Sequence, residues 1–136
     1  MDTHRILLLS ADLDLAARLQ TRLRPTVVLE WCGSVREVTE RLEEEPEVAA
    51  LLVDVPRRSP RMLRGLRQVA ALLPALALVP PGDEPLAHRC LDAGARQVLR
   101  MDRSVDGTLL ETCLATLLGP SGRPAHATTT VGPYLA

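Results

Sequence analysis

Five short apolar segments, separated by stretches with helical spacing, constrain the fold of this chain more than any other feature. Segments 5–10, 48–54 and 75–79 are almost continuously apolar, as is typical of strands that are covered on both faces. Segments 26–32 and 97–99 complete the set. Strands that alternate with helices form right-handed βαβ units. The sequence therefore predicts an α/β fold with a doubly wound, parallel sheet of five strands.

Capping residues mark where several predicted helices begin or end. Ser34 and Glu37 have the spacing of a capping box, in which each side chain accepts a hydrogen bond from a free backbone N–H. Pro60 suits the first turn of the third helix. Gly94 can adopt the left-handed conformation that ends the fourth helix. The first helix is expected to continue until Pro25 stops it.

Composition narrows the class of protein. The chain has 136 residues and a net charge of -1, which gives no global bias toward nucleic acid or membrane surfaces. No run of about 20 apolar residues is present, and the N-terminal apolar run is too short for a signal peptide. We expect a cytoplasmic protein in which Cys32, Cys90 and Cys113 are reduced thiols that pack as small apolar side chains.

The folded domain is predicted to cover residues 1–119. Residues 120–136 are rich in Pro, Gly, Ala and Thr and contain few apolar side chains at either the helical or the strand period. Such a composition is typical of a flexible tail, or of a linker to an output domain.

Two charged runs stand out. Residues 57–67 contain five arginines and no acid, and residues 37–47 contain six glutamates. A basic run can bind anions or nucleic acid. In the predicted fold, however, these runs lie on neighbouring helices, so we expect them to neutralise each other. Nucleic acid is accordingly not expected as a partner.

Asp54 ends the apolar segment 48–54 and is the first candidate functional residue. An unpaired carboxylate in an apolar setting costs several kcal/mol, so its position needs a reason. In open parallel sheets, ligands and chemistry lie at the carboxyl ends of the strands. Asp54 is therefore predicted to lie at this edge of the sheet, where solvent can reach it.

Three stretches and one acid carry a resemblance to a known family: RILLLS at 5–10, LLVD at 51–54, LDAGARQVLRMD at 91–102, and Asp83, ten residues before Ala93. With the order of the predicted elements, they resemble the receiver domain of two-component response regulators over residues 4–118. The resemblance implies a flavodoxin-like (βα)5 sheet with strand order 2-1-3-4-5.

The resemblance also implies a phosphorylation site. In the family, an Asp at the position of Asp54 accepts a phosphoryl group, and two adjacent acids after the first strand hold magnesium. In this chain the acid pair falls on Ser10 and Ala11, and Asp12 is the nearest acid. A lone carboxylate holds magnesium only weakly, so we expect no dedicated metal site and no cofactor, with weak magnesium binding as the alternative.

Other positions of the implied site are substituted as well. Val79 stands at the position of the family's hydroxyl residue, and Met101 at that of its lysine. Val98 stands at the position of the aromatic switch residue. The chain contains no lysine, and Arg100 is expected to point to the opposite face of the sheet.

These departures favour a degenerate pseudo-receiver domain, not an enzyme, that works by protein–protein contact with Asp54 as a vestigial phosphoacceptor. The expected partner is a protein of a signalling pathway, such as a histidine kinase or an output domain, or a second copy of the chain. One alternative is a true phosphorylation switch with rearranged ligands, including Asp12. Another is a small-ligand-binding or enzymatic domain at the same strand ends.

Overall fold

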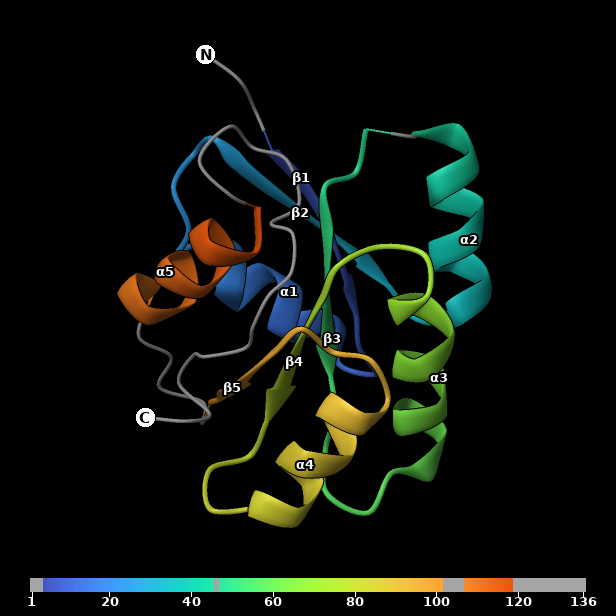
Figure 1. Ribbon diagram of the computed structural model, residues 1–136. Helices are drawn as coiled ribbons and strands as arrows, with labels where there is room; N and C mark the ends of the chain where they lie inside the picture. Colours follow the sequence, from blue (N-terminus) through green and yellow to red (C-terminus); the bar gives the residue numbers. More distant parts are fainter. Residues whose placement is uncertain (1–3, 46, 102–106, 119–136) are drawn as a thin grey trace.

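The computed structural model describes residues 4–45, 47–101 and 107–118, in which five strands alternate with five helices (Figure 1). The strands are β1 (His4–Leu9), β2 (Val27–Cys32), β3 (Ala50–Asp54), β4 (Ala75–Val79) and β5 (Gln97–Arg100). The helices are α1 (Leu13–Gln20), α2 (Val35–Glu44), α3 (Pro60–Ala70), α4 (Glu84–Asp92) and α5 (Gly107–Leu118).

The strands form one parallel sheet in the order β2-β1-β3-β4-β5. Helices α2, α3 and α4 cover one face of the sheet, and α1 and α5 cover the other (Figure 1). This arrangement confirms the predicted flavodoxin-like α/β fold and its strand order.

The central strands are buried on both faces, as their continuous apolar character predicts. Leu51 and Leu52 are neighbours in β3 and both are fully buried. Leu51 packs in the cluster under α2, α3 and α4, whereas Leu52 packs in the cluster under α1 and α5. Burying one such side chain contributes about 1.5–3 kcal/mol, so these strands anchor both layers of helices.

Helix α1 ends earlier than predicted, at Gln20 instead of near Pro25. The Gln20 side chain turns to the edge strand β2, where its amide donates to the Val27 carbonyl at 2.8 Å and accepts from the Leu29 N–H at 2.7 Å. These bonds satisfy backbone groups at the open edge of the sheet, and the chain continues in a turn. Leu23 is nevertheless buried, as its apolar character requires.

The predicted caps are present. The Ser34 hydroxyl accepts from the Glu37 N–H at 3.2 Å, and the Glu37 carboxylate accepts from the Gly33 N–H at 2.9 Å. Pro60 is the first residue of α3. Gly94 follows α4 with a φ of 114°, a conformation that side chains rarely adopt.

Cys32, Cys90 and Cys113 are buried and free. Burial raises the pKa of each thiol to about 11. The thiols therefore stay protonated near neutral pH and pack as small apolar groups, in agreement with the sequence prediction.

The predicted tail or linker, 120–136, lies outside the described residues, so the boundary at residue 119 stays a prediction. Among the helices that the structure describes, none combines the length and hydropathy that a membrane crossing requires.

Replacing Gly94 by Ala tests how α4 ends. The new Cβ would have to tolerate the positive φ and would lie 3.1 Å from the Ala70 Cβ. We expect a loss of about 1–3 kcal/mol in the free energy of unfolding, measured by urea denaturation. Gly82→Ala is the matched control, because Gly82 has a φ of 82° but open space around it. Its cost should be smaller, about 1 kcal/mol, and equal costs for the two variants would contradict this account.

Candidate functional site

Ser10 and Asp54 meet at the carboxyl ends of the two central strands. Asp54 is the last residue of β3, and Ser10 directly follows β1 in a parallel register that places both on one edge of the sheet. The Ser10 hydroxyl donates a hydrogen bond to Asp54 Oδ2 at 2.8 Å. Ser10 is fully buried, whereas Asp54 is partly buried. The carboxylate therefore lies where the sequence predicts, held by a neighbouring hydroxyl.

Asp12 is engaged through both of its carboxylate oxygens. As the N-cap of α1, its Oδ1 accepts from the Asp14 N–H at 3.0 Å. Its Oδ2 accepts from the Arg18 guanidinium at 3.2 Å. The Asp12 backbone N–H donates to the Ser10 hydroxyl oxygen at 2.9 Å. Ser10 therefore connects Asp54 to the start of α1, while the Asp12 side chain serves α1 itself.

The pKa of the Asp54 carboxyl is raised above its ordinary value. Burial is the largest cause, because it penalises the charged form, and the nearby Asp12 charge adds to it. The hydrogen bond from Ser10 and the charge of Arg18 act in the opposite direction. Folding therefore disfavours ionised Asp54, and this destabilisation is relieved as the pH falls through the raised pKa.

Two residues that sequence reasoning missed complete the site. The Trp31 indole donates a hydrogen bond to the Ser10 carbonyl at 3.0 Å. The register of β1 and β2, which pairs Leu8 with Trp31, could have indicated this neighbour. Arg18 is the cation of the site, although its spacing of four residues from Asp14 would have predicted a pair within the helix.

Among the substituted positions Ser10 is polar, whereas Ala11, Val79, Val98 and Met101 contribute apolar side chains. Ala11 is exposed after β1. Val79 and Val98 are buried in the cluster under α2, α3 and α4. The Met101 N–H donates to the Val79 carbonyl at 2.8 Å, and its side chain packs against the cluster under α1 and α5. None of these four side chains can donate a hydrogen bond to an anion beside Asp54.

Arg100 points away from Asp54, as expected from strand alternation. Its guanidinium pairs with Glu84 on α4 at 2.8 Å. It therefore does not replace the lysine that the resemblance implies. Arg103, the other arginine near this strand end, lies outside the described residues.

The residues present do not fit a magnesium ion. Magnesium requires oxygen ligands in near-octahedral geometry. Ala11 offers a methyl group, and both Asp12 oxygens already serve the helix cap and Arg18. Within the described ranges, no group of three or more His, Cys, Asp or Glu residues is arranged to hold a metal ion. The arrangement instead holds the partly buried Asp54 carboxylate through the Ser10 hydroxyl.

Trp31 is the only tryptophan of the chain and can report the titration of Asp54 through Ser10. A fluorescence titration should show a transition whose midpoint lies above the ordinary pKa of Asp. Asp54→Asn should abolish it. Ser10→Ala should move the midpoint higher and cost about 1.5–3 kcal/mol of stability at neutral pH, because a bond to a charged group is lost.

The matched control is Asp14→Asn, which removes an exposed acid of α1 and should leave the transition unchanged. A midpoint at or below the ordinary value for Asp, or a transition that survives Asp54→Asn, would contradict this description of the site.

Comparison with solved structures places the fold among receiver domains. A response regulator from Thermotoga maritima superposes with a TM-score of 0.69 at 17% identity, over 82% of this chain and 94% of that one. A response regulator receiver protein from Burkholderia phymatum gives a TM-score of 0.65 at 20% identity, over 83% and 94%. A two-component response regulator of the LuxR family from Aurantimonas sp. SI85-9A1 gives 0.67 at 18% identity, over 92% and 90%.

The likeness is structural, because no protein-family model and no curated protein matches the sequence. Identities of this size show the fold alone. Together with the observed strand order, they lead to one conclusion: this chain has the flavodoxin-like α/β fold of response-regulator receiver domains.

Proposed function

We propose that this chain is a receiver-like signalling domain that acts through protein–protein contact, without ordinary magnesium-dependent phosphorylation of Asp54. The observation that carries the proposal is that the polar groups around Asp54 form hydrogen bonds and an ion pair with one another and with α1. Ser10 donates to Asp54, and Asp12 is occupied by its own helix and by Arg18. Because these groups already have partners within the folded chain, they support the proposal that no magnesium site forms beside Asp54.

Phosphoryl transfer to Asp54 would bring a group of about -1.5 to -2 charge against a carboxylate. Catalysis of such a step depends on cations that neutralise the developing charge. Met101 supplies no charge at the lysine position, and the charge of Arg18 is directed to Asp12. The transition state would therefore lack both of its usual sources of positive charge.

The side chains that would transmit a modification of Asp54 to the surface are also substituted, at Val79 and Val98. A ligand shifts a conformational equilibrium only as far as it binds the two states differently. Val79 cannot hydrogen-bond a phosphoryl oxygen. Val98 is fully buried, stiff at χ1 and too short to move between two pockets. A change at Asp54 thus has little influence on the surface formed by α4, β5 and α5.

The proposed partner is a protein of a two-component pathway, such as a histidine kinase or an output domain. The names of the structural neighbours support this class of partner, since they include two-component response regulators. The exposed parts of α4 and α5 are the proposed contact surface, and Arg89 is an exposed residue of α4.

Thermal unfolding with and without magnesium tests the proposal. A site of millimolar affinity would stabilise the fold by about 1.4 kcal/mol at ten times its dissociation constant. For a domain of this size the melting temperature would rise by roughly 3–6 °C. We expect no such shift. Ala11→Asp places a second carboxylate beside Asp12 and should respond to magnesium. A rise in the wild type that Asp54→Ala abolishes would favour the phosphorylation switch.

Titration of a partner identified by affinity capture tests the contact surface. Asp54→Ala should leave the affinity within about threefold, or roughly 0.7 kcal/mol. Arg89→Glu should weaken binding more than about tenfold, because it reverses a charge on the proposed surface. If Asp54→Ala abolishes binding while Arg89→Glu does not, the edge of the sheet is the working site and the proposal is wrong.

A further inference from the structure

The arginine run at 57–67 is not neutralised by the glutamate run at 37–47, contrary to the sequence prediction. The arginines of α2 pair with glutamates of α2 and β2. Arg57 pairs with Asp83, at 3.7 Å. Across the described ranges no ion pair joins the two runs, so the members of each run that have no other partner present their charge to solvent.

A group of arginines without ion-pair partners among the described residues lies at the start of α3. Arg58, Arg61 and Arg64 are exposed and form no ion pair with any described residue; we call them the basic end. No acid occupies the first turn of α3. Because the start of a helix carries positive partial charge, Arg58, just before α3, and Arg61, in its first turn, raise the free energy of the isolated helix. An external anionic group would relieve that repulsion.

The opposite charge lies at the end of α2. Glu43 and Glu44 are exposed in its last turn and pair with no described residue; we call them the acidic end. The end of a helix carries negative partial charge, so these glutamates are also placed unfavourably. Both helices follow strands of one parallel sheet and therefore run in the same direction (Figure 1). The two charged ends thus lie at opposite ends of a single two-helix face.

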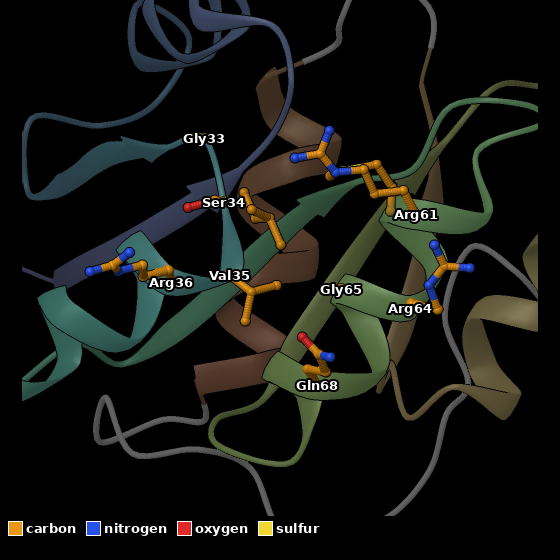
Figure 2. A pocket seen from close by; sticks show the side chains of 10 residues that line it. Gly33, Ser34, Val35, Arg36, Arg61, Arg64, Gly65 and Gln68 are labelled. Carbon is orange, nitrogen blue, oxygen red and sulfur yellow. The ribbon is translucent and has the colours of Figure 1, made fainter.

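A pocket lies between the two helices near the basic end (Figure 2). Its volume is about 320 Å³, and Leu9, Val35 and Met62 contribute its apolar lining. Arg61 and Arg64 stand on the α3 side, in the view of Figure 2. The pocket therefore offers apolar contact bordered by positive charge.

Gly65 also lines the pocket and keeps the two helices close. A Cβ at Gly65 would lie 3.3 Å from the Val35 Cγ2. Leu72, just past the end of α3, has 51% of its surface exposed. It adds exposed apolar area just beyond the end of α3.

We propose that the face formed by α2 and α3 is a self-association surface of this chain. A second copy binds to it across a two-fold axis, so that the basic end of each copy contacts the acidic end of the other. Such an isologous contact needs a self-complementary patch, and opposite charges at the two ends of one face provide it. This inference is independent of the proposed function, which concerns α4, β5 and α5.

The charges of the α2–α3 face also argue against binding partners other than a second copy. The chain's own residues 119–136 contain no acid, so they carry no complement to the arginines. A nucleic acid would be repelled by the glutamates of the same face. A second copy satisfies both ends at once.

Sedimentation of the full chain over a concentration series up to about 1 mM tests the inference. We expect a monomer–dimer equilibrium that weakens with added salt, because the Debye length falls from about 10 Å to about 3 Å between 0.1 and 1 M. Arg61→Glu/Arg64→Glu and Glu43→Arg/Glu44→Arg should each weaken the dimer at least tenfold. An equimolar mixture of the two variants should dimerise again, since each then offers the complementary charge.

The control is Arg22→Glu/Arg24→Glu, which makes the same change in net charge in the turn after α1 and should dimerise like the wild type. Neither the α3 variant nor the α2 variant should melt below the wild type, because acids suit the start of a helix and bases suit its end. A wild type that stays monomeric, or variants that dimerise normally, would overturn the inference. So would a monomer whose arginines bind polyglutamate, since the basic end would then serve a foreign acidic partner.

Discussion

Burial of the central strands on both faces is the constraint from which the rest of the structure follows. β1, β3 and β4 have no solvated face, so polar groups can be placed only where these strands end. At that edge, a carboxylate needs a donor from a neighbouring strand. Ser10 provides it for Asp54, and the same hydroxyl accepts from the start of α1. The polar edge of this sheet is consequently part of its structural framework.

The alternation of strands and helices could be predicted from the sequence, because apolar runs and caps are local signals, whereas the strand order was implied by the resemblance to receiver domains. Ser34, Pro60 and Gly94 occupy the positions that their chemistry indicates. The end of α1 could not be predicted, because it depends on the Gln20 amide finding the edge of β2.

The site was predictable in part. The position of Asp54 could be predicted because the apolar segment that forms β3 ends there. The apolar character of Ala11, Val79 and Met101 is evident from their residue types. The hydrogen bonds of the site could not be predicted, because Ser10, Trp31 and Arg18 approach from different elements. The direction of each side chain decides which pairs form. The prediction that the charged runs 37–47 and 57–67 neutralise each other is wrong for the same reason. Two helices can be neighbours without pointing their opposite charges toward each other.

The central claim is that Asp54 is held by a structural hydrogen bond from Ser10 and is not equipped for phosphoryl transfer. The most direct measurement is the intact mass of the protein after incubation with acetyl phosphate and magnesium. The account predicts an unchanged mass, with the Ala11→Asp/Val79→Thr/Met101→Lys variant as the positive comparison. Gain of one phosphoryl group by the wild type, absent in Asp54→Asn, would contradict it.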